Sequence, residues 1–249
     1  MTAPGTGLEP ALVLEDVSVG WGGTALLHDL AIHVPRGCVY ALLGRNGCGK
    51  TTLVRSLLGQ KRALRGRLRL LGEDAWEGRE RLMARVGVVP EQPDAPPDMT
   101  VRQIAAFTGG LYPRWDAGLV AARLDRFGVP LATPFGRLSK GQQGATMLAL
   151  ALGHEPELLI FDDPTLGLDI VARDALLTEV IGELADRGVT VFLTTHALEI
   201  VEGIADQVGI LRDGRLVVDG RMEQLKAERQ SSLADIFRQA VGAPKGAQG

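Results

Sequence analysis

The chain has 249 residues, of which 45% are hydrophobic, and a formal net charge of −3 at pH 7. This length and composition fit one large α/β domain or two small ones and exclude bulk disorder. Because the chain has no global basic field, no nucleic-acid partner is expected. No apolar run approaches the roughly 18–20 residues that span a bilayer, and the N-terminus lacks a signal-peptide pattern, so the chain by itself is expected to be soluble.

The first part of the sequence predicts a mainly β region. Residues 1–10 are rich in Gly, Pro and Thr and are expected to be flexible. Strands are predicted at 12–19, 30–34, 66–71 and 86–89. Arg and Leu alternate in the third of these, which is typical of a half-exposed antiparallel strand.

The middle of the sequence, about 93–155, predicts an inserted helical region. Thr100 and Gln103 have the spacing of a capping box and open one helix. Asp116 can cap a second helix, and a third follows Ser139. The last part returns to an α/β pattern, with a strand at 158–162, a helix near 172–187, a strand at 189–194, a hairpin of 207–212 and 215–218, and an amphipathic helix from Arg221.

A phosphate-binding loop is the most specific motif. It consists of Gly44, Arg45, Asn46, Gly47, Cys48, Gly49, Lys50, Thr51 and Thr52, which fit G-x-x-x-x-G-K-[ST]. An apolar strand precedes the loop and a helix follows it, so backbone N–H groups and the helix N-terminus can hold an anion. Lys50 supplies a charge for the outer phosphates, and the Thr51 hydroxyl suits Mg²⁺. The loop predicts a nucleoside triphosphate as ligand.

Two acids and a histidine are expected at the same edge of the sheet, because ligands bind beyond the carboxyl ends of parallel strands. Asp162 ends a buried strand, so its charge needs a partner or a metal, and Mg²⁺ fits. Asp163 could orient the attacking water, and His196 is expected to face the γ-phosphate. The alternatives are a turn before Pro164 for the acids and an ordinary polar role for the histidine.

The two cysteines indicate a reducing compartment. A disulfide at Cys48, inside the phosphate loop, would hinder ligand binding, whereas Cys38 lies in the preceding strand. Because Cys48 lies among backbone N–H groups and beside Lys50, its thiol is predicted to have a lowered pKa.

Together these motifs resemble the nucleotide-binding subunits of ATP-binding-cassette (ABC) transporters. Residues 44–52 look like Walker A, 158–163 like Walker B, and 166–169, which ends in Asp169, like the D-loop. The signature motif is matched from Leu138 by Ser139, Lys140, Gly141 and Gln142, with Lys140 at the variable third place. His196 corresponds to the switch histidine, and Trp21 to the aromatic residue that stacks on adenine.

The resemblance implies a RecA-like P-loop core with an antiparallel β subdomain and an inserted α-helical subdomain. The ABC ATPase domain would cover 11–225, followed by a C-terminal helix and tail at 226–249. Two subunits, identical or different, would close head to tail with each MgATP between Walker A of one and the signature of the other. ATP hydrolysis would energise a separate transmembrane permease of exporter type. The chain would be cytoplasmic and peripheral on the inner face of the cell membrane.

The sequence departs from the family pattern at two places. The residue after the Walker B Asp is usually Glu, the catalytic base, and here it is Asp163. The shorter side chain retracts the carboxylate by ~1 Å, and misplacement on that scale can cost about 10²-fold in rate. The usual Gln after the strand 86–89, a Mg²⁺ and partner contact, is matched by either Glu91 or Gln92.

Two other functions are compatible with these motifs. The first is a soluble ABC protein acting in DNA repair, translation or iron–sulfur assembly, which the single cassette without a coiled-coil insertion or basic arm disfavours. The second is a regulatory ATP-binding module with little turnover, which is suggested by Asp163.

Overall fold

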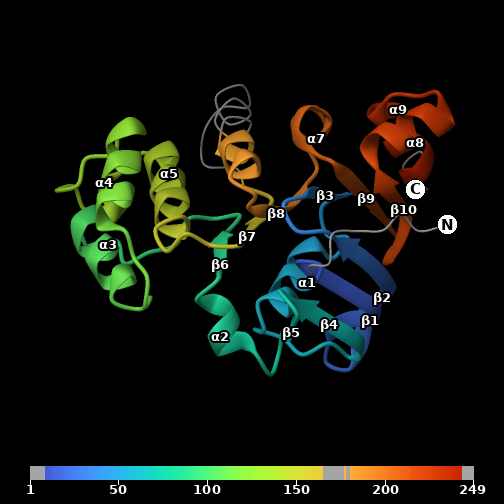
Figure 1. Cartoon of the computed structure of the whole chain (residues 1–249), viewed down its shortest axis with the longest axis horizontal. Coiled ribbons are helices and arrows are strands. Elements are labelled where there is room, and N and C mark those ends of the chain that lie inside the picture. Colours follow the sequence, from blue (N-terminus) through green and yellow to red (C-terminus); the bar gives the residue numbers. More distant parts are fainter. Residues whose placement is uncertain (1–8, 165–176, 178–179, 243–249) are drawn as a thin grey trace, which may run out of the picture.

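The computed structural model describes residues 9–164, 177 and 180–242, and two β-sheets organise it (Figure 1). The smaller sheet is antiparallel and has the strand order β2-β1-β4-β5. Its strands are β1 (Leu12–Trp21), β2 (Thr24–Val34), β4 (Arg65–Leu70) and β5 (Glu73–Asp74). This is the antiparallel β subdomain that the sequence predicts, although β2 begins six residues earlier than the predicted 30–34.

The larger sheet has the strand order β10-β9-β3-β8-β7-β6. The five strands from β9 to β6 are parallel, and β10 pairs with β9 in the antiparallel direction. The strands are β3 (Val39–Gly44), β6 (Val86–Val89), β7 (Leu158–Asp162), β8 (Thr190–Thr195), β9 (Gln207–Arg212) and β10 (Arg215–Arg221). The predicted α/β class with a RecA-like core is confirmed.

Both faces of the larger sheet are buried. On β3, Val39 and Leu43 belong to one apolar cluster, whereas Tyr40 and Leu42 belong to another, as the period of two along a strand requires. The second cluster also contains Leu53 of α1 (Lys50–Leu57), which packs between the two sheets. The phosphate-loop helix is therefore fixed on both sides by apolar packing.

A separate apolar cluster holds three helices within the predicted insertion together. They are α3 (Val101–Gly109), α4 (Ala117–Arg126) and α5 (Lys140–Ala151), on the side of β6 away from β10 in Figure 1. Thr100 and Gln103 form the predicted capping box of α3, and the Asp116 carboxylate accepts the N–H of Leu119 at the start of α4. A short helix, α2 (Arg79–Met83), precedes β6.

The C-terminal part contains two helices where the sequence predicts one. After α7 (Leu198–Ile204) and the β9–β10 hairpin come α8 (Met222–Arg229) and α9 (Leu233–Val241). Gln230, with φ 47°, ends α8. The predicted domain boundary after residue 225 falls inside α8. Leu225 and Ile236, on either side of that boundary, both pack on the core.

Of the helix predicted near 172–187, the described residues 177 and 180–186 are helical. In the part of the chain that the structure describes, no helix is long and apolar enough to cross a membrane.

Candidate functional site

The phosphate loop joins the end of β3 to the start of α1, as predicted. Gly47 and Gly49 have φ angles of 77° and 108°, in the region that side chains with a Cβ rarely adopt. A Cβ at Gly49 would also lie 2.9 Å from Leu27 Cδ2, and one at Gly44 would lie 2.6 Å from Cys48 Sγ. Gly47 is therefore favoured by the backbone conformation, Gly44 by close packing, and Gly49 by both.

Lys50 is a buried cation at the centre of the loop. Its ammonium donates to the carbonyl oxygens of Gly44, at 2.8 Å, and Arg45, at 3.4 Å, and lies 3.8 Å from Asp163 Oδ2. Only 6% of the side chain is exposed. Such a charge, held by two neutral carbonyls and one carboxylate beside an open hollow, is well placed for the more highly charged oxygens of a polyphosphate.

Asp162 lies deep beside the loop, where its carboxylate is bound by two hydroxyls. Thr194 Oγ1 donates to Asp162 Oδ1 at 2.9 Å, and Thr51 Oγ1 donates to the same oxygen at 3.2 Å. Burial raises the pKa of Asp162, and the hydrogen bonds from Thr194 and Thr51 partly oppose that effect. A hydroxyl and a carboxylate that converge on one point at the phosphate loop are oxygen ligands of the kind that Mg²⁺ prefers.

Asp163 lies between the loop and His196. The backbone N–H of Asp163 donates to the Thr194 carbonyl at 2.9 Å, which fixes the residue at the edge of the sheet. Its φ angle of 44° turns the chain at the end of β7. His196 Nδ1 is 2.9 Å from Asp163 Oδ2, so the three groups Lys50, Asp163 and His196 form a continuous polar row.

Trp21 lies beside the first turn of α1, at the end of β1. Its indole Nε1 donates to Thr52 Oγ1 at 3.4 Å, and 53% of the residue is exposed. The ammonium of Lys61 is 3.7 Å from the ring centroid. The position next to the phosphate loop and the exposure of the ring fit a residue that stacks on a base.

Glu91 and Gln92 follow β6 and reach the same edge of the sheet. Glu91 lines the hollow beside the phosphate loop together with Lys50, Thr51 and Asp163. Glu91 and Gln92 both line a neighbouring hollow that contains Thr51 and Asp162. Glu91 therefore borders both hollows, whereas Gln92 borders one.

The predicted signature residues begin α5, away from the phosphate loop (Figure 1). Ser139 Oγ accepts the N–H of Gln142, and Gln142 Oε1 accepts the N–H of Ser139, both at 3.2 Å. Ser139 and Lys140 are exposed, and Gly141 is partly exposed. None of these four residues lines the described hollows beside the phosphate loop, so a single chain does not bring the two predicted anion sites together.

The structure corrects the prediction for Cys48. Burial raises the pKa of its thiol, and the effects of Lys50 and of nearby backbone N–H groups, which lower the pKa, are smaller. Burial also raises the pKa of Cys38, to about 12. The expected thiolate at Cys48 is wrong because the loss of hydration outweighs the neighbouring positive charge.

One site residue, Thr194, is missing from the predicted set. Thr194 binds both acids, since its hydroxyl donates to Asp162 and also accepts the N–H of Asp163, at 3.1 Å. The pair of threonines at the end of the predicted strand is the only signal for it in the sequence. Asp169 of the predicted D-loop lies outside the described residues.

Residues 27–166 match a family model described as ABC transporter. The chain is 36% identical over 241 residues to the Nod factor export ATP-binding protein I of Paraburkholderia xenovorans (strain LB400), which covers 92% of this chain and 77% of the relative. It is 30% identical over 220 residues to the bacitracin transport ATP-binding protein BcrA of Bacillus licheniformis, and the match covers 88% of this chain and 72% of the relative. The fold matches a solved ATP binding subunit of an ABC transporter with a TM-score of 0.83 and 28% identity, over 92% of this chain and 99% of that one.

Proposed function

The chain belongs to the ABC transporter family, whose ATP-binding subunits are ATPases that power transport, and we propose that it energises a separate membrane-spanning exporter. One observation carries the proposal. A phosphate loop, two acids and a histidine meet at the carboxyl ends of β3, β7 and β8, and Lys50 is within 4 Å of the second acid, Asp163. This arrangement suits the positioning of a nucleoside triphosphate and of the water that attacks it.

The roles of individual residues follow from their positions. Lys50 and the loop N–H groups would hold the β- and γ-phosphates, and Trp21 would stack on the adenine. Mg²⁺, held by Thr51, Asp162 and either Glu91 or Gln92, would offset the negative charge of the phosphates. Asp163 would orient the attacking water and accept its proton.

His196 would hold Asp163 in place and reach the γ-phosphate. Its Nδ1 is already 2.9 Å from the carboxylate, and 48% of its side chain is exposed at the rim of the site. A histidine in this position would respond to the presence of the terminal phosphate, because it contacts the proposed base and about half of its side chain is exposed.

A second ATPase subunit, identical or different, would complete the site. Ser139, Lys140, Gly141 and Gln142 lie at an exposed helix start that has an anion-binding geometry but no access to the phosphate loop of their own chain. In a head-to-tail dimer this helix start would close over the ATP of the partner. ATP would therefore join the two subunits, and hydrolysis would release them.

The relatives named above support a role in export. One is named for Nod factor export and another for bacitracin transport, and each aligns with about nine-tenths of this chain. A separate transmembrane permease would hold the chain on the inner, cytoplasmic face of the cell membrane. A regulatory ATP-binding module with little turnover is the second candidate, because Asp163 has a shorter side chain than the usual glutamate.

Purification of the tagged chain from the membranes of its own organism tests the proposal. We expect a membrane-spanning protein to co-purify and the complex to hydrolyse MgATP. Lys50→Ala should lower steady-state hydrolysis by at least about 100-fold. The control Arg67→Ala, whose side chain is 74% exposed on β4, should not.

Three results would count against parts of this account. Equal ATP turnover in the parent and in Lys50→Ala would show that the phosphate loop is not part of the ATP site. A purified chain that hydrolyses MgATP but co-purifies with no membrane-spanning protein would contradict the export role. A membrane complex that binds ATP with almost no hydrolysis would favour the regulatory module.

A further inference from the structure

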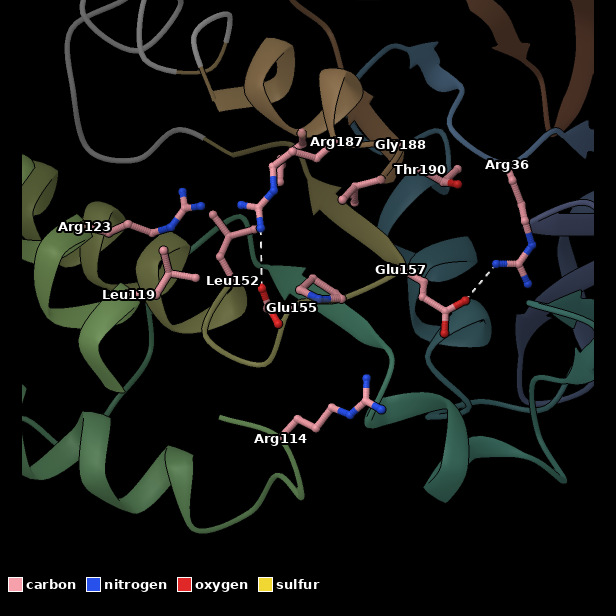
Figure 2. Close-up of a pocket in the computed structure, with 13 residues that line it drawn as sticks. Arg36, Arg114, Leu119, Arg123, Leu152, Glu155, Glu157, Arg187, Gly188 and Thr190 are labelled. Atoms are coloured by element: carbon pink, nitrogen blue, oxygen red, sulfur yellow. Dashed lines mark hydrogen bonds and ion pairs between the residues drawn. The ribbon is translucent and has the colours of Figure 1, made fainter. Parts of the chain in front are cut away.

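A second cavity lies at the opposite edge of the larger sheet from the phosphate loop. Its volume is about 330 Å³, and its lining includes Glu157, just before β7, and Thr190, the first residue of β8 (Figure 2). Leu119 and Arg123 of α4 close it from the helical side. We propose that this cavity binds a small organic phosphate, at a site separate from the ATP site.

The cavity is positively charged in a chain that is negative overall. Four arginines and two glutamates line it, namely Arg36, Arg114, Arg123, Arg187, Glu155 and Glu157. Glu183, which contacts Arg123 and Arg187 from outside the lining, is matched by a further arginine, Arg126. The local excess of two positive charges contrasts with the formal net charge of −3 for the whole chain.

Arg123 is the strongest single indication of a ligand. Only 5% of this residue is exposed, and its Nε has no hydrogen-bond partner among the described residues. One terminal nitrogen donates to Glu183 Oε1 at 3.1 Å. An unpaired N–H on a buried guanidinium is costly, and an anionic oxygen in the cavity would relieve that cost.

Two further arginines line the cavity, and one of them, Arg187, is also ion-paired with Glu155 at 3.4 Å. Arg187 Nη1 lies 3.7 Å from the Glu183 oxygen that Arg123 binds, which brings these two guanidinium groups together, as Figure 2 also shows. Arg114 lines the cavity and has no ion pair within the described part of the chain. Figure 2 shows Arg114 on the other side of Glu155 from Arg123 and Arg187, so these two arginines would contact the phosphate and Arg114 would add to the positive potential of the cavity. A monoester phosphate has close to two negative charges at neutral pH and several acceptor oxygens, which matches this pair of arginine donors better than a single carboxylate does.

The rest of the lining selects an organic phosphate over the free ion. Leucine, proline and valine side chains form part of the wall, at Leu119, Leu152, Pro156, Leu184 and Val189. The volume is at the lower end of the range of about 300–1,000 Å³ found for ligand sites. The occupant therefore has a phosphate group and a small apolar body, and it bridges α4 and the larger sheet.

Calorimetric titration with phenyl phosphate, in the presence of saturating MgADP to block the phosphate loop, tests this site. We expect saturable binding of one phenyl phosphate per chain, tighter than that of inorganic phosphate. Arg114→Gln should weaken binding severalfold, because it removes one exposed positive charge from the cavity wall without breaking an ion pair. Arg123→Leu should weaken it further, provided that its MgADP affinity and melting temperature show a folded protein.

The matched control is Arg102→Gln, an exposed arginine on α3 that does not line the cavity, and it should bind phenyl phosphate as the parent does. Absence of saturable binding, or equal affinities in the parent, Arg114→Gln and Arg102→Gln, would overturn the proposal. Equal affinities for phenyl phosphate and inorganic phosphate would overturn the assignment of an apolar body. Failure of MgADP to bind would contradict the proposed ATP site instead, so the two proposals fail separately.

Discussion

His196 Nδ1 lies 2.9 Å from Asp163 Oδ2, and the same carboxylate oxygen lies 3.8 Å from Lys50 Nζ. Asp163 thus contacts the loop on one side and the histidine on the other, with 15% of its side chain exposed. A carboxylate held in this way can keep its orientation while ATP enters, but its reach toward a water molecule is one methylene shorter than that of glutamate.

Asp163→Glu is predicted to accelerate the chemical step. The added methylene moves the carboxylate by ~1 Å toward the attacking water, which can be worth up to about 10²-fold, or ~2.7 kcal/mol. A glutamate would shift the carboxylate relative to Lys50 and His196, which Asp163 contacts, and this opposes the full gain, so we expect a several-fold rise. Single-turnover hydrolysis of MgATP measures the effect, with ATP affinity nearly unchanged.

Asp163→Asn is the control for that experiment, because it keeps the size of the side chain and removes the base. It should hydrolyse ATP more slowly than the parent protein in a single turnover. An Asp163→Glu rate equal to or below that of the parent would mean that Asp163 is already well placed or is not the base.

Trp21→Ala is predicted to weaken MgADP binding by about tenfold. Stacking of a base on an aromatic ring contributes roughly 1–3 kcal/mol, and Trp21 Nε1 already lies 3.4 Å from Thr52 Oγ1 of the phosphate loop. Trp21→Phe should recover most of the affinity. Calorimetry with Trp76→Ala, a tryptophan that is also partly exposed, gives the matched control. Equal losses of MgADP affinity in Trp21→Ala and Trp76→Ala would show that Trp21 does not contact the nucleotide.

The Glu157 ion pairs predict an acid-dependent loss of stability. The hydrogen bond from Arg85, together with one from Arg36, lowers the pKa of Glu157 from its usual value of 4.5 to about 2. A carboxyl with a lowered pKa stabilises the folded state fully above about pH 4.5, and that stabilisation is lost as the pH falls toward about 2. Because 42% of the side chain is exposed, solvent screening limits the contribution at neutral pH to about 1 kcal/mol.

Urea unfolding of Glu157→Gln measures this contribution. The variant should be less stable than the parent at neutral pH by about 1 kcal/mol, and the difference should shrink as the pH falls below about 4.5. Glu15→Gln, whose side chain is 58% exposed and 3.9 Å from Arg67, should show a smaller change. A difference for Glu157→Gln that stays constant with pH would contradict the lowered pKa.

The local features that the sequence predicts well are those set by short-range rules. The strand and helix on either side of the phosphate loop, the capping box of Thr100 and Gln103, and the hairpin of 207–212 and 215–218 each depend on a few neighbouring residues, and the structure confirms them. The parallel strands β3 and β7 can also be predicted from the sequence. Both of their faces are buried, so their sequences are apolar as far as Gly44 and Asp162, where the strands end.

Features that depend on tertiary packing are harder to predict. The hydroxyls of Thr51 and Thr194 both bind Asp162, although they lie 111 and 32 residues from it along the chain. The break at Gln230 has no glycine or proline to mark it. At Cys48 the sequence shows the charge of Lys50 but not the burial that outweighs it.

The central claim is that ATP joins two subunits through the start of α5, and the oligomeric state of Asp163→Ala with MgATP tests it most directly. Removing the base should trap a closed dimer, which size-exclusion chromatography with light scattering would detect, whereas MgADP should leave monomers. Ser139→Arg in the same background should prevent the dimer, because a bulky side chain would block the partner's γ-phosphate. A dimer that forms with MgATP equally well in Asp163→Ala with and without Ser139→Arg would contradict the account.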